Sequence, residues 1–106
     1  MMQYDADQFG GHSRDEFVAT LSAEGVPCSP GYTRPLSEEP ALVRLREKYP
    51  DLIKRHPCPN VERICRRSVW LFQSMLLASR GDMDDVVEAT AKIRDAFRAD
   101  SSRVGE

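Results

Sequence analysis

All seven prolines of this 106-residue chain lie between Pro27 and Pro59. Proline fixes one backbone dihedral and removes an N–H donor, so it is confined to turns, helix starts and edge strands. We therefore expect the middle of the chain to be rich in loops. Any strand over residues 26–32 should be short or at an edge, and Pro40 should open a helix that Pro50 closes.

The flanking segments carry clearer helix signals. Ser13 and Glu16 form a capping box ahead of an apolar stripe, and Gly25 supplies a left-handed stop, which together predict a helix over residues 14–24. A second helix is expected over residues 82–99, with Glu88 and Lys92 as an i, i+4 ion pair. Its apolar stripe comprises Met83, Val86, Val87, Thr90, Ile93 and Phe97.

Shorter elements fill the rest of the chain. We expect strands over residues 3–9, 69–72 and 75–78, with Trp70 and Phe72 in the core. A short helix over residues 60–67 should turn three side chains inward: Val61, Ile64 and Cys65. The alternation predicts an α+β fold, a small sheet with helices packed on one face. Residues 1–100 should form this single domain and residues 101–106 a frayed tail.

Composition narrows the function classes. Apolar residues make up 41% and charged residues 30% of the chain, and the formal net charge is −2. This balance gives no general attraction to nucleic acid or to an anionic membrane. The chain shows no transmembrane stretch and no secretory leader, so a cytoplasmic location is expected. An odd set of three cysteines at unpatterned spacing indicates reduced thiols.

No pattern predicts a catalytic, metal or cofactor residue. A zinc site could draw on His56, Cys58, Cys65 and Cys28, and a thiol nucleophile on Cys28 or Cys58 with His12 or His56. Neither has the spacing of a known motif, so we read them as core and loop residues. One basic cluster could bind phosphates or form a solvated face paired with Glu62 and Asp51, the interpretation we prefer. It comprises Lys54, Arg55, Arg63, Arg66 and Arg67.

Five segments in register carry a resemblance to a known family. They are residues 4–17 (Tyr-Asp-x-x-x-Phe-Gly-Gly-x-Ser-Arg-Asp-x-Phe), 21–32, 59–63, 68–71 (Ser-Val-Trp-Leu) and 82–93. In this order they resemble the C-terminal small domain of the DegT/DnrJ/StrS sugar aminotransferases. The resemblance implies the aspartate-aminotransferase fold, known as fold type I. It also implies pyridoxal phosphate (PLP) as cofactor, glutamate or glutamine as amino donor, and a keto-sugar or keto-cyclitol as acceptor.

The same resemblance implies a substrate-side loop with Tyr32 and Ser29 as contacts, together with Gln73. Phe72 stands where the family has a proline, which departs from its pattern. The family's large domain, which carries the Schiff-base lysine, has no counterpart in this chain. We therefore expect a C-terminal lobe that binds no cofactor and is inactive alone. It would be a fragment or one half of a split enzyme, working with a PLP-binding large domain or a homodimer partner. The alternative is a non-catalytic module that pairs with a separate large-domain chain or with itself.

Overall fold

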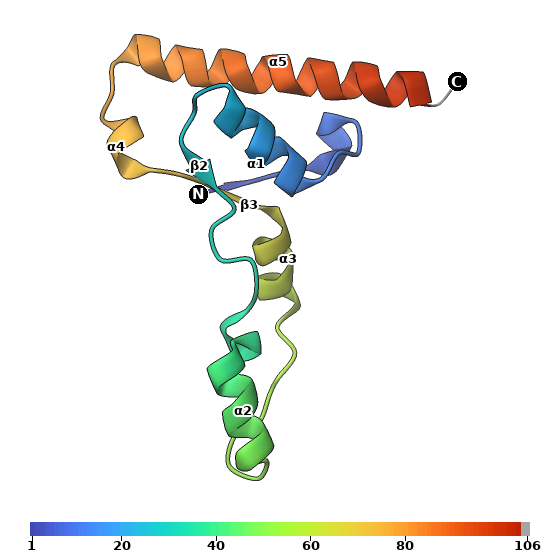
Figure 1. Cartoon of the computed structure of the whole chain (residues 1–106), viewed down its shortest axis with the longest axis vertical. Helices are drawn as coiled ribbons and strands as arrows, with labels where there is room; N and C mark the ends of the chain where they lie inside the picture. Colours follow the sequence, from blue (N-terminus) through green and yellow to red (C-terminus); the bar gives the residue numbers. More distant parts are fainter. Residues whose placement is uncertain (105–106) are drawn as a thin grey trace.

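The computed structural model describes residues 1–104, which form an α+β fold around a three-stranded antiparallel sheet (Figure 1). In chain order the elements are β1 (Met2–Gln3), the 3-10 turn η1 (Ala6–Phe9), α1 (Arg14–Ala23), β2 (Cys28–Ser29), η2 (Leu36–Glu38), α2 (Pro40–Lys48), α3 (Pro59–Arg67), β3 (Ser68–Leu71), α4 (Gln73–Leu76) and α5 (Arg80–Val104). No helix within residues 1–104 combines the length and apolar character needed to cross a membrane.

The sheet is built around β3, with β1 on one side and β2 on the other. Met2 lies opposite Val69, and Cys28 lies opposite Leu71. Prolines on both sides of β2 keep it to two residues at the sheet edge, as expected from the sequence. Both pairings join segments far apart in the chain.

Alternate residues of β3 face opposite sides of the sheet. Val69 is buried in the core, and Leu71 packs against the core's edge. The core itself consists of Tyr4, Phe17, Val18, Leu21, Val26, Val69 and Ile93. Helices α1 and α5 cover this face (Figure 1), which confirms the predicted fold class. Ser68 and Trp70 belong to the opposite face, where they line a cavity.

Helix α1 follows its local signals. The Ser13 hydroxyl accepts a hydrogen bond from the Glu16 N–H at 3.2 Å, as an N-cap should. At the other end Gly25 has φ +91°, and its N–H and that of Val26 bond back to the last turn in a Schellman motif. The Glu16 carboxylate does not complete the capping box, because it contacts His12 Nδ1 at 2.5 Å instead.

The start of α5 contains a capping box formed by Ser79 and Asp82, three residues apart in the sequence. The Ser79 hydroxyl accepts from the Asp82 N–H at 3.2 Å, while the Asp82 carboxylate accepts from the Ser79 N–H at 3.1 Å. The helix therefore begins at Arg80, two residues before the predicted start. Lys92 pairs with Glu24, the residue that follows α1, at 2.9 Å and not with Glu88.

The C-terminal part of α5 includes residues 101–104, for which the sequence predicts a frayed tail. The helix continues to Val104, and residues 105–106 lie outside the described residues. Arg98 donates to the Gln8 carbonyl at 2.8 Å, and the Ser101 hydroxyl donates to the Gly10 carbonyl. These contacts hold the end of α5 against η1, whereas the sequence predicts no tertiary contacts for the residues after 100. Val87, placed in the apolar stripe, is 67% exposed because α5 touches the domain along a narrower face.

One predicted strand is shorter than expected and another is absent. The first ends at Gln3, because the Asp5 carboxylate accepts from the Asp7 N–H and opens the 3-10 turn that Gly10 (φ +65°) closes. The segment 75–78 contains no strand, since the chain turns after Phe72 into the short helix α4. The sequence also predicted that Phe72 and Val61 face the core, but both are exposed.

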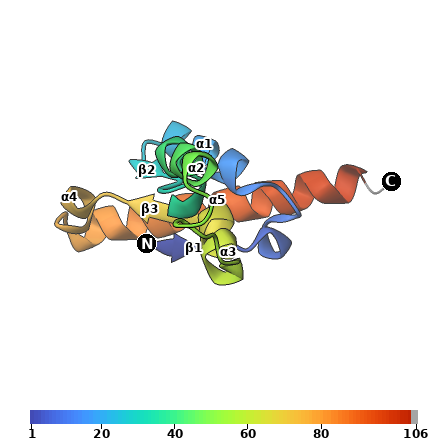
Figure 2. The same ribbon diagram turned by 90° about the horizontal axis from the view of Figure 1, so that it is seen from below.

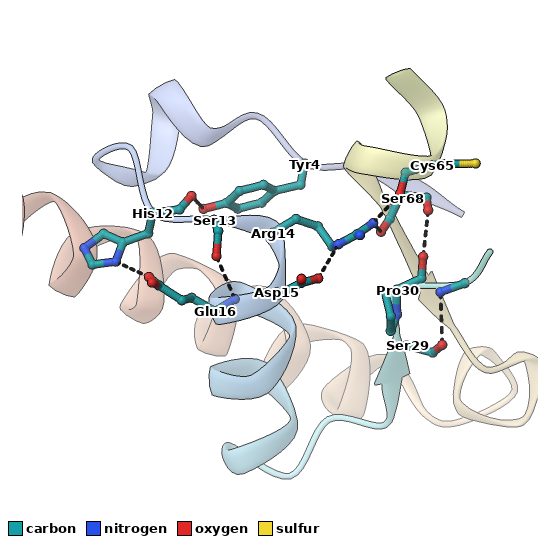
Figure 3. A network of polar contacts seen from close by, with 11 residues as sticks. Tyr4, His12, Ser13, Arg14, Asp15, Glu16, Ser29, Pro30, Cys65 and Ser68 are labelled. Carbon is teal, nitrogen blue, oxygen red and sulfur yellow. Dashed lines mark hydrogen bonds and ion pairs between the residues drawn. The ribbon is translucent and has the colours of Figure 1, made fainter. Parts of the chain in front are cut away.

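Arg14 joins α1 to the segment where α3 passes into β3. Its side chain is 10% exposed, and its guanidinium donates to the carbonyls of Cys65 (2.8 Å) and Ser68 (3.1 Å), as Figure 3 shows. Carbonyls at a helix C-terminus have no intrahelical partner, so a cation there is stabilising. A basic residue in the first turn of α1 is thus explained by its partners on another helix.

The molecule is much more open than a compact domain of its size. Its Cα radius of gyration is 17.9 Å, whereas about 13 Å is typical of this length. The accessible surface is 7733 Å², about 1,700 Å² more than a folded monomer of 12.0 kDa exposes. The cause is an arm, residues 33–57, that carries α2 away from the sheet (Figure 1). Figure 2 shows α2 nearly end on, in front of α5. Helix α2 buries no residue.

Candidate functional site

The sheet face that α1 and α5 leave uncovered is hollowed into an apolar cavity of about 720 Å³. Its walls come from the N-terminus, the segment after β2, helix α3 and strand β3. The lining residues are Met1, Tyr32, Arg34, Pro35, Leu36, Glu39, Val61, Ile64, Cys65, Ser68 and Trp70. A cavity of this size with few polar groups is typical of a binding site.

Trp70 lies where the loop after β2 crosses the sheet. Gly31 has φ +71°, and a Cβ atom there would lie 2.4 Å from the indole Nε1. Only glycine therefore lets the backbone pass this close to the ring. The ring of Tyr32 meets the indole edge to face, with centroids 5.1 Å apart. Trp70 is thus half-buried at the cavity wall, whereas the sequence predicted it in the core.

The loop that carries Tyr32 is held by two hydroxyl groups (Figure 3). The Ser29 hydroxyl accepts from the Gly31 N–H at 3.0 Å, and the Ser68 hydroxyl donates to the Pro30 carbonyl at 2.7 Å. Ser68 is buried, so its hydrogen bond fixes the loop against β3. The loop therefore presents Tyr32 at the cavity from a rigid base.

One polar atom of the cavity wall lacks a partner. The indole Nε1 of Trp70 is buried and has no hydrogen-bond acceptor within the described part of the chain. A buried donor without an acceptor costs about 1–3 kcal/mol. At the rim, Arg34 lies 3.5 Å from Glu39. The cavity thus offers an apolar wall, one free N–H donor and an ion pair at its edge.

The three residues predicted to contact substrate are placed differently. Tyr32 lines the cavity and is 74% exposed. Ser29 is half-buried and its hydroxyl is engaged in the turn. Gln73 begins α4, is exposed, and does not line the cavity. The structure therefore brings Tyr32 and Ser29 into one loop and leaves Gln73 outside that cavity.

The basic cluster is spread over separate partners. Arg55 lies 2.8 Å from Glu38 and 3.5 Å from Glu62, so it bridges the arm and α3. Arg67 donates to the Tyr4 carbonyl at 3.1 Å, and Arg63 donates to Asn60. Arg66 and Lys54 are exposed. These contacts are those of a solvated face.

A second cluster of polar side chains surrounds His12, and the sequence motifs did not predict it. Its Nδ1 lies 2.5 Å from Glu16 and its Nε2 lies 3.4 Å from Asp100, while its ring stacks on Phe97 at 4.2 Å. The i, i+4 spacing of His12 and Glu16 is the signal that could have found half of it. Within residues 1–104, no group of three or more His, Cys, Asp or Glu side chains is arranged to hold a metal ion.

The lysines do not fit a PLP site. A lysine that forms a Schiff base must be desolvated or lie beside another cation. Lys48 and Lys54 are exposed on the arm, and Lys92 is 69% exposed and paired with Glu24. Since the chain contains no other lysine, its own residues do not supply the covalent attachment.

Comparison with known proteins gives one informative likeness. A protein from Streptoalloteichus tenebrarius, whose name gives it a presumed L-glutamine:3-amino-2,3-dideoxy-scyllo-inosose aminotransferase activity, is 31% identical over 113 residues. The match covers 92% of this chain and 27% of the relative, in its C-terminal portion. The chain thus spans about a quarter of that protein's length. No family model matches the chain, and no solved structure does.

Proposed function

We propose that this chain is the C-terminal lobe of a PLP-dependent aminotransferase of the DegT/DnrJ/StrS type. One observation carries the proposal: nearly the whole chain is similar to the C-terminal portion of a relative named as an aminotransferase. That name gives L-glutamine and an amino-deoxy-scyllo-inosose. We accordingly propose a keto-sugar or keto-cyclitol as the amino acceptor.

The exposed lysines indicate that this lobe does not hold the cofactor and contributes to substrate binding instead. PLP supplies an electron sink for amino-group transfer when it is bound, and we assign its binding to a large domain outside residues 1–106. The lobe contributes the rigid loop of residues 29–32. The Tyr32 phenol can pack against a sugar ring and also hydrogen-bond to its hydroxyl groups. The lobe alone should therefore neither bind PLP covalently nor transfer an amino group.

Co-expression tests this proposal. The 106-residue chain is tagged and produced together with the portion of the S. tenebrarius protein that precedes the matched segment. We expect a yellow complex that transfers an amino group from L-glutamine to a keto-cyclitol, while the tagged chain alone is colourless and inactive. A yellow adduct on the chain alone, abolished by changing one lysine to alanine, would contradict the assignment. So would a co-purified complex without activity.

The role of Tyr32 has its own test in that complex. Tyr32→Phe removes one hydrogen bond to substrate, worth about 1 kcal/mol, and should raise KM for the keto substrate about fivefold. Tyr49→Phe removes a phenolic hydroxyl from the arm and is the matched control, with KM expected to be unchanged. Equal KM values for the two variants would remove Tyr32 from the substrate site.

A second candidate is a non-catalytic interaction module, favoured by the unusually large exposed surface. On this reading the chain binds a large-domain protein or itself, and no amino transfer accompanies the binding. A compact monomer in sedimentation, with no binding of an apolar dye, would exclude this alternative.

A further inference from the structure

We propose that Ser68, at the start of β3, is a positioning residue for Tyr32 at the substrate site. The inference rests on the proposed function and deepens it by naming the side chain that holds the loop of residues 29–32 in place. Ser68 does not touch the substrate in this proposal. It acts through that loop, because the path of the loop backbone determines where the Tyr32 phenol lies.

The burial of Ser68 separates it from the other polar side chains. It is 2% exposed, and no other serine, threonine, amide or charged side chain within residues 1–104 is as deeply buried. Serine is mostly exposed in folded proteins, because a buried hydroxyl is unfavourable unless it is hydrogen-bonded. Ser68 lines a mainly apolar cavity, where an apolar side chain would fill the same space without that cost. The hydroxyl is therefore explained by the hydrogen bond that it makes.

That hydrogen bond connects the loop to a fixed part of the fold. The Ser68 hydroxyl donates to the Pro30 carbonyl at 2.7 Å, across 38 residues of sequence. The Ser68 carbonyl in turn accepts from the Arg14 guanidinium at 3.1 Å. Arg14 also donates to the carbonyl of Cys65, so α1 holds the end of α3 and the start of β3 together (Figure 3). Ser68 thus transmits this fixed geometry to the loop.

The loop contacts that follow end at Tyr32. Ser29 lies opposite Trp70 in the sheet, and its hydroxyl accepts from the Gly31 N–H at 3.0 Å. The Gly31 backbone passes against the indole, and the Tyr32 ring meets the same indole edge to face. The Tyr32 side chain nevertheless remains exposed. An exposed aromatic side chain on a fixed backbone is preorganised, so a ligand that binds it loses less conformational entropy.

Removing the Ser68 hydroxyl should weaken substrate binding and spare the chemical step. In Ser68→Ala the Pro30 carbonyl loses its donor, and the loop gains freedom that the substrate must remove on binding. In the co-expressed complex, KM for the keto substrate should rise about fivefold, the effect expected of Tyr32→Phe, and kcat should stay within about twofold of wild type. The double variant should have the KM of Tyr32→Phe alone, because the ring then has no hydroxyl to place.

Ser101→Ala is the matched control. The Ser101 hydroxyl also donates to a loop carbonyl, that of Gly10, but it lies near the C-terminal end of α5 and does not line the cavity. Both substitutions remove one such hydrogen bond and should lower the urea midpoint of the 106-residue chain similarly. Only Ser68→Ala should raise KM. The comparison separates positioning of Tyr32 from a general loss of stability.

Fluorescence provides a second measurement that needs no enzyme activity. Trp70 is the single tryptophan of the chain and lies under the loop. In the 106-residue chain alone, Ser68→Ala should shift its emission to longer wavelength and increase acrylamide quenching about twofold, because the loop opens locally. Ser101→Ala should match the wild-type chain in both measurements.

Three results would overturn the inference while an active wild-type complex leaves the proposed function intact. The first is an unchanged KM in Ser68→Ala, or a rise that Ser101→Ala shares. The second is a KM in the double variant that multiplies the two single effects, since Ser68 and Tyr32 would then act independently. The third is wild-type fluorescence in Ser68→Ala. An inactive wild-type complex refutes the proposed function itself, and the positioning role with it.

Discussion

Replacing Gly31 by alanine should destabilise the lobe through two separable effects. The residue has φ +71°, which costs a side-chain-bearing residue about 1–2 kcal/mol. The added Cβ would also lie 2.4–2.8 Å from three atoms of the Trp70 indole, so the ring must move. Overpacking of this kind costs roughly a further 1–3 kcal/mol. The combined loss of unfolding free energy is therefore about 2–5 kcal/mol.

Gly25→Ala isolates the backbone contribution. Gly25 has φ +91°, but a Cβ there would meet no atom within 4 Å. It should lose only the strain, about 1–2 kcal/mol. Urea unfolding followed by circular dichroism measures both variants, and fluorescence of Trp70 reports the disturbed loop in Gly31→Ala alone. If Gly31→Ala and Gly25→Ala unfold at the same urea concentration, the close passage of the loop over the indole is refuted.

Three further outcomes follow from contacts described above. Ser79→Ala should remove about 1 kcal/mol and speed amide exchange in the first turn of α5, whereas Ser102→Ala should leave both unchanged. Arg14→Ala should cost about 2–4 kcal/mol in urea unfolding because two carbonyls lose a charged donor, with Arg94→Ala as an exposed control within about 0.5 kcal/mol. Burial, with a smaller contribution from Glu16 and Asp5, raises the pKa of Tyr4 to about 12 from an ordinary value near 10. The stability that the neutral phenol contributes is thus present below pH 10 and lost as pH rises toward 12. Tyr4→Phe should flatten the fall of Tm in that window, and an unchanged slope would contradict this cause.

The sequence predicts the ends of helices correctly where a single residue determines the local backbone geometry. Ser13 and Gly25 set the two ends of α1, and Pro40 opens α2. The strands were harder, because β1 is defined by its pairing with β3, some 66 residues away. Residues 75–78 have the composition of a strand, but no strand within residues 1–104 pairs with them, and the first two of them belong to α4.

The candidate site was only partly predictable. Tyr32 was singled out through the family resemblance, and it does line the cavity. Trp70 was assigned to the core because it lies in an apolar run, although its alternation with Val69 and Leu71 places it on the other face. What opens that face is the arm's departure from the sheet. No local sequence pattern predicts this departure, because it depends on how little α2 packs against the core.

The contacts between the end of α5 and the turn at η1 have a consequence for folding during protein synthesis. Arg98 and Ser101 bond to residues 90 and 91 positions earlier in the chain. Strand β1 likewise finds its partner only when β3 has been made. Contacts of such long sequence separation form late, because each must first close a long loop. The N-terminal strand and turn therefore stay unpaired until almost the entire lobe has left the ribosome.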